Sequence, residues 1–70
     1  MDFNELVDEV ERIYPELMEM LRRRHPEYIP LYMMRYEYVV KPYPPAMRMH
    51  NAIQILETYT LLKKEAENDE

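Results

Sequence analysis

Proline divides this 70-residue chain, which contains six prolines and no glycine. Five of the prolines bracket residues 31–41, with Pro26 and Pro30 before them and Pro42, Pro44 and Pro45 after them. Proline fixes the backbone angle φ and pushes the residue before it toward an extended conformation. We therefore expect residues 28–45 to form an extended element between two flanking segments.

Side chains in this block alternate with the period of a strand. One parity holds Tyr32, Met34, Tyr36, Tyr38 and Val40, and the other holds Met33, Arg35, Glu37, Val39 and Lys41. Such alternation, rich in aromatic residues, is typical of a half-buried strand. Tight hairpin turns favour glycine pairs, which the chain lacks, so we predict a single strand over residues 31–41. A lone strand would be completed by a partner protein or by a second copy of the chain.

The residues before this block predict a helix over residues 2–24. Apolar side chains recur at helical spacing, at positions 3, 6, 7, 10, 13, 14, 17, 20 and 21. Asp2 and Glu5 have the spacing of a capping box, and three arginines precede the stop at Pro26. Pro15 falls on the polar side, where a kink is favoured; a break after Tyr14, with Pro15 opening a second short helix, is the alternative.

A second helix is predicted over residues 45–66, with Pro45 in the first position. The acidic residues 65–70 are expected to fray, because carboxylates are unfavourable at a helix C-terminus. The predicted fold is mainly α: two amphipathic helices joined by one extended, proline-fenced segment, in a single small domain covering residues 1–70.

Size and composition limit how such a chain is stabilised. Seventy residues bury little apolar surface, and the absence of cysteine excludes disulfides. We therefore expect extra stability to come from a partner or from self-association. The absence of glycine together with abundant Glu and Arg fits a protein from a hot environment, although seven methionines do not.

The chain offers little for catalysis or for holding a cofactor. It contains no serine, cysteine or glycine, which removes the common nucleophiles and the phosphate-binding loops. His25 and His50 do not have the spacing of metal ligands. We expect a protein that is not an enzyme, with no cofactor, metal or small-molecule substrate.

Tyrosine and methionine exceed what so small a core can bury, and both are enriched at protein interfaces. The leading hypothesis is a protein-interaction module, an inhibitor or modulator of a larger intracellular protein, that binds by strand addition through residues 31–41 and by an amphipathic helix over residues 46–62. The candidate partner-binding residues are Met33, Met34, Tyr36, Tyr38, Tyr43, Met47, Met49, Ile53, Leu56 and Tyr59.

Two alternatives remain open: a homodimeric nucleic-acid-associated regulator and a structural homodimer of helical hairpins. In the first, Arg22, Arg23 and Arg24 would contact phosphate, although a net charge of −5 does not favour nucleic acid as a partner. No apolar run reaches the length of a membrane span, and the N-terminus is acidic where an export signal is basic. We therefore expect a cytoplasmic protein without a membrane partner.

Overall fold

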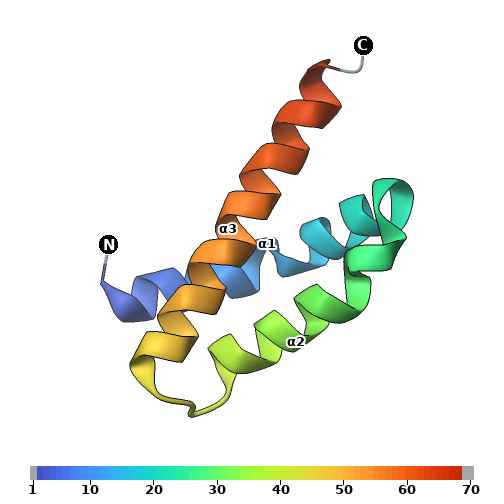
Figure 1. Ribbon diagram of the computed structural model, residues 1–70. Helices are drawn as coiled ribbons and strands as arrows, with labels where there is room; N and C mark the ends of the chain where they lie inside the picture. Colours follow the sequence, from blue (N-terminus) through green and yellow to red (C-terminus); the bar gives the residue numbers. More distant parts are fainter. Residues whose placement is uncertain (1, 69–70) are drawn as a thin grey trace.

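The computed structural model describes residues 2–68, which form three α-helices and one short 3₁₀-helix. These are α1 (Phe3–Arg24), η1 (Pro26–Tyr28), α2 (Ile29–Val40) and α3 (Pro45–Asn68). Residues 41–44 join α2 to α3 as a helical hairpin, and α1 crosses behind α3 (Figure 1). Both turns are made without glycine, and no residue in the described part of the chain has a positive φ.

Helix α1 begins at a capped N-terminus. The Asp2 side chain accepts a hydrogen bond from the Glu5 amide at 2.8 Å, which satisfies one free donor of the first turn. At the other end, the amide of His25 donates to the carbonyl of Leu21 before Pro26 ends the helix. The helix continues through the exposed Pro15, so the alternative of a break after Tyr14 is wrong.

The prediction of a strand over residues 31–41, within an extended segment 28–45, is wrong, because α2 is a helix. The ten alternating residues 32–41 also accommodate helical spacing, and here Tyr32, Tyr36 and Val39 turn toward the core. Pro30 lies in the first turn, where a missing amide costs nothing, so it starts a helix rather than excluding one. A helix also satisfies its backbone internally, whereas a single strand cannot.

Helix α3 begins at Pro45, and the carbonyl of Pro44 accepts from the amides of Met47 and Arg48. It extends to Asn68, so residues 65–68 are helical, and residues 69 and 70 lie outside the described residues. The expected fraying of residues 65–70 stays a prediction. The expected pair of helices with a crossing extended segment is thus replaced by three helices, and the protein is mainly helical.

All three helices contribute to one core. The buried apolar side chains are Val10, Ile13, Leu17 and Leu21 from α1, Tyr32 and Val39 from α2, and Ala52, Ile55 and Leu62 from α3. The α1 residues recur every three or four positions, which is the spacing of one helix face. Because α1 packs on one side of the α2–α3 hairpin, the hairpin retains exposed surface elsewhere.

Candidate functional site

Large apolar side chains are exposed on α2, on α3 and on the turns at the two ends of α2. They are Tyr28, Leu31, Met33, Met34, Tyr43, Met47, Met49, Ile53 and Leu61, with exposed fractions between 36% and 63%. We call these nine residues the apolar surface. Its members come from two sides of α3, because Met49 and Ile53 lie about 100° or more around the helix from Met47.

Helix α1 differs from the apolar surface in its exposure pattern. Every Phe, Leu, Val, Ile, Tyr and Met of α1 is buried or half-buried. Its exposed positions are mainly charged, and Glu9–Arg12 and Glu19–Arg23 form ion pairs along it. This is the ordinary pattern of a surface helix with one packed face and one solvated face. The excess of exposed apolar area is therefore confined to residues 28–61.

The structure divides the predicted partner-binding residues into two groups. Met33, Met34, Tyr43, Met47, Met49 and Ile53 are exposed, whereas Tyr36, Tyr38, Leu56 and Tyr59 are half-buried. Tyr36 stacks on Tyr14 of α1, with ring centroids 3.9 Å apart. Burial raises the pKa of Tyr14, and the neighbouring Tyr36 adds to the rise. Tyr36 therefore contributes to the packing of α2 against α1.

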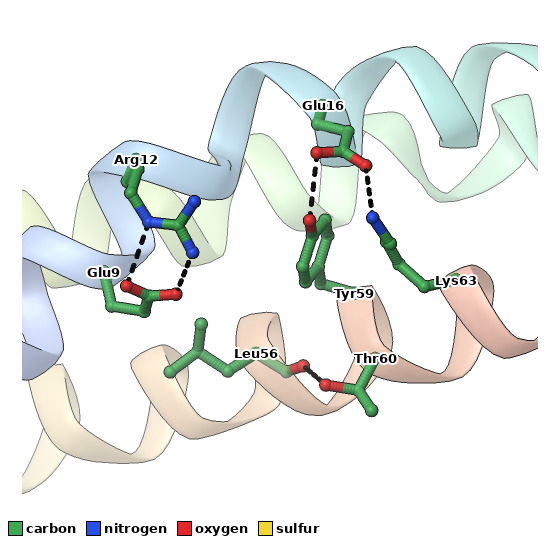
Figure 2. A network of polar contacts seen from close by, with 7 residues as sticks. All are labelled: Glu9, Arg12, Glu16, Leu56, Tyr59, Thr60 and Lys63. Carbon is green, nitrogen blue, oxygen red and sulfur yellow. Dashed lines mark hydrogen bonds and ion pairs between the residues drawn. The ribbon is translucent and has the colours of Figure 1, made fainter.

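Tyr59 belongs to a polar contact between α1 and α3 (Figure 2). Its hydroxyl donates to one oxygen of Glu16 at 2.9 Å, and the Lys63 ammonium donates to the other oxygen at 3.2 Å. The hydrogen bonds from Tyr59 and Lys63 lower the pKa of Glu16, and the bond to Glu16 raises the pKa of Lys63. These groups link two helices of the same chain, which gives Tyr59 a structural role.

Polar contacts also fasten α2 to α3. The hydroxyls of Tyr32 and Thr58 are hydrogen-bonded, and Arg48 Nε donates to the Val39 carbonyl at 2.8 Å. Arg35 Nη1 donates at 2.9 Å to Oδ1 of Asn51, a polar residue that is only 6% exposed. Asn51 in turn donates to the carbonyl of Met47 at 2.9 Å. We call the boundary that these contacts hold together the α2–α3 seam.

A cleft of about 240 Å³ opens where the end of α1, the start of α2 and the second half of α3 meet. Its lining is largely apolar, with His25 and Glu65 as the ionisable members; the lining residues are Leu21, His25, Tyr28, Leu31, Tyr32, Thr58, Leu61, Leu62 and Glu65. Small-molecule sites usually occupy about 300–1,000 Å³, so the cleft matches one large side chain better than a whole ligand.

The basic cluster at the end of α1 is partly neutralised. Arg22 and Arg23 both pair with Glu19, and His25 lies 3.6–3.7 Å from Glu27 and Glu65. The exposed side chains of Arg22 and Arg23 are thus held along their own helix by a carboxylate. Phosphate contact by Arg22, Arg23 and Arg24 remains a prediction.

Several exposed or seam residues were missed by the sequence analysis, namely Tyr28, Leu31, Arg35 and Leu61. Reading residues 29–40 as a helix would have placed Leu31, Met34 and Tyr38 on one stripe, since they are three and four positions apart. Leu61 is 63% exposed beside a Leu62 that is 4% exposed, and the two-leucine run gives no sign of which one is buried.

Among residues 2–68, the structure shows no group of three or more His, Asp or Glu side chains placed to hold a metal ion. None of the helices in this range combines the length and apolar character that a membrane span requires. Comparisons with protein-family models, with curated proteins and with solved structures found no match.

Proposed function

We propose that this protein is a non-enzymatic protein-interaction module that binds a larger protein through the apolar surface of α2 and α3. The observation that carries the proposal is the concentration of all nine exposed large apolar residues within Tyr28–Leu61. Strand addition is no part of this proposal, because residues 29–40 are helical. The interaction is instead between helix faces.

The area of the apolar surface supports a protein partner. If a side chain of this size presents on the order of 200 Å² when fully exposed, the nine together present roughly 800 Å². A typical stable interface buries about 800 Å² on each partner, so a partner that covered the whole apolar surface would have to reach both sides of α3. Four of the nine are methionines, whose flexible side chains adapt to irregular partner surfaces.

A chain of this kind acts by occupying a surface. Through its apolar surface, it would inhibit or modulate its partner by covering the partner's own interface. This part of the proposal rests on size and on the apolar surface, and it predicts no turnover of any substrate.

The test is capture of proteins from an extract of the source cells on immobilised full-length protein. The wild type is compared with Leu61→Asp, which places a charge on the apolar surface, and with the control Asn4→Asp, which adds the same charge at an exposed position of α1. Proteins retained by the wild type and Asn4→Asp but lost with Leu61→Asp support the proposal. Identical retention by all three proteins would refute it. Light scattering over a dilution series shows whether the partner is a second copy.

A further inference from the structure

Two stripes of side chains border the α2–α3 seam on the same side. Leu31, Met34 and Tyr38 lie on α2, and Met47, Gln54 and Leu61 lie seven residues apart on α3. At one end Leu31 and Leu61 line the same cleft; at the other, the ring of Tyr38 packs edge-on against Tyr43, 4.8 Å between centroids, in the turn that leads to Met47. From position 47 to position 61 the helix rises about 21 Å. A helix of roughly four turns would cover this length.

Arg35 places an uncompensated positive charge between these two stripes. Its only hydrogen bond among residues 2–68 is from Nη1 to the neutral amide oxygen of Asn51, and its Nε is buried without an acceptor. Within the described residues it forms no ion pair, although its guanidinium lies 5.6 Å from the ring centroid of Tyr32. Because Nε is buried, a carboxylate of a partner would reach this guanidinium through its Nη groups. A partner that covered the seam without supplying a carboxylate would bury this charge at a cost.

The segment that forms α2 and most of α3 carries a net charge opposite in sign to that of the whole protein. Residues 29–64 contain five bases and two acids; the bases are Arg35, Lys41, Arg48, Lys63 and Lys64, and the acids are Glu37 and Glu57. This segment therefore carries a net charge of +3 in a chain of net charge −5. A symmetric dimer places the same patch on both sides of its interface, so it would bring like charges together. Lys41 pairs with Glu37, Lys63 pairs with Glu16, and Glu65 lines the cleft. The charge at the seam that an acidic partner would complement is therefore that of Arg35.

We infer that the α2–α3 seam binds one amphipathic helix of another protein, which carries a carboxylate opposite Arg35 and inserts a large apolar side chain into the cleft between Leu31 and Leu61. This inference rests on the proposed function and specifies the partner's chemistry. The apolar stripes supply the binding area, and Arg35 selects for an acidic helix. Helix-in-groove binding uses apolar anchors at helical spacing, and complementary charges across an interface add specificity.

The test measures binding of three labelled 16-residue helical peptides to the full chain by fluorescence anisotropy. The peptides share one leucine stripe and differ only at the positions flanking it, which are all Glu, all Gln or all Lys. We expect the Glu peptide to bind at least about tenfold more tightly than the Gln peptide, with the Lys peptide weakest. In Arg35→Gln the difference between Glu and Gln should disappear, and Arg35→Lys, which keeps the charge, should retain a preference for Glu. Leu61→Asp should weaken binding of all three peptides. Circular dichroism checks that each variant is folded.

Three results would overturn the inference: equal affinity for the three peptides, a Glu preference that survives in Arg35→Gln, or no binding of any peptide. A dimer in sedimentation equilibrium that is lost in Leu61→Asp would also overturn it, because the occupant would then be a second copy. Each of these results leaves the proposed function to be decided by the capture experiment. Capture that depends on Leu61, together with equal peptide affinities, would refute this inference and leave the proposed function standing.

Discussion

The same substitution at two adjacent leucines of α3 should change the free energy of unfolding by very different amounts. Leu61 is 63% exposed, and Leu62 is 4% exposed and belongs to the core formed by all three helices. Replacing a buried leucine by alanine costs about 2–5 kcal/mol, because apolar contacts are lost and a cavity remains. The same change at an exposed leucine removes little burial and should alter the free energy of unfolding by less than about 0.5 kcal/mol.

These magnitudes are large relative to the stability of so small a protein. At about 0.05–0.15 kcal/mol per residue, a 70-residue chain has a free energy of unfolding of roughly 3.5–10 kcal/mol. Leu62→Ala should therefore remove a large share of the total, and Leu61→Ala almost none. Urea denaturation followed by circular dichroism at 222 nm measures both. With a slope of about 1 kcal/mol per molar urea, the Leu62→Ala midpoint should fall by about 2 M or more.

The reasoning would be refuted if the two variants lost similar stability, or if Leu61→Ala were the more destabilised of the two. Either result would mean that α3 presents a different face to α1 and α2. Binding provides an independent comparison. Under the proposed function, Leu61→Ala lowers affinity for the partner while leaving the fold intact.

Three further predictions concern single contacts. Tyr32→Phe removes the hydroxyl bonded to Thr58 and should lower the free energy of unfolding, measured by urea denaturation, by about 0.5–1.5 kcal/mol. Tyr28→Phe, at an exposed ring, should change it very little. Equal effects of the two substitutions would contradict the contact between Tyr32 and Thr58. Met34→Pro, at an exposed position inside α2, should lower the free energy of unfolding by about 3 kcal/mol, because proline removes a helix hydrogen bond. If Met34→Pro were as stable as Met34→Ala, residues 29–40 would not be helical. The pKa of Glu16 is lowered in the folded protein, so its contribution to stability is present above the ordinary value of 4.5 and is lost as the pH falls below it. The melting temperatures of the wild type and Glu16→Gln should therefore differ at pH 7 and converge toward pH 3. A difference that stays constant over this range would argue against the contacts of Glu16 with Tyr59 and Lys63.

The first and last helices could be predicted from the sequence because the residues that indicate them act locally and do not depend on how the helices pack. The Asp2 cap, the apolar spacing of α1 and the position of Pro45 at the start of α3 are local features, and the structure has helices in both places. The same local reasoning failed for residues 31–41, because alternation over ten positions fits a strand, whereas Tyr32, Tyr36 and Val39 also form a helix face. Tertiary packing favours the helix over the strand, because a helix here buries Tyr32 and Val39 against α1 and α3. A local sequence pattern does not show this packing.

The sequence indicated which residue types form the candidate surface, but not which of their side chains are exposed. Surplus methionine and tyrosine indicated contact area, yet which side chains face outward depends on how α2 and α3 rotate against α1. Tyr59 illustrates the difference, because its position in an apolar helix suggested a binding residue, and its contact with Glu16 is internal. Arg35 shows the converse: a lone arginine in an apolar segment gave no signal until Asn51 and the seam were placed beside it.

The side of the α2–α3 hairpin away from α1 is the binding face that we propose. Methyl NMR of ¹³C-labelled methionine reports on it directly, because Met34 and Met47 lie on the stripes bordering the seam and Met18 and Met20 lie on α1, half-buried beside the core. On addition of the Glu peptide to the full chain, we expect the methyl signals of Met34 and Met47 to shift and those of Met18 and Met20 to remain in place. Shifts confined to Met18 and Met20, or an unchanged spectrum at saturating peptide, would contradict the claim.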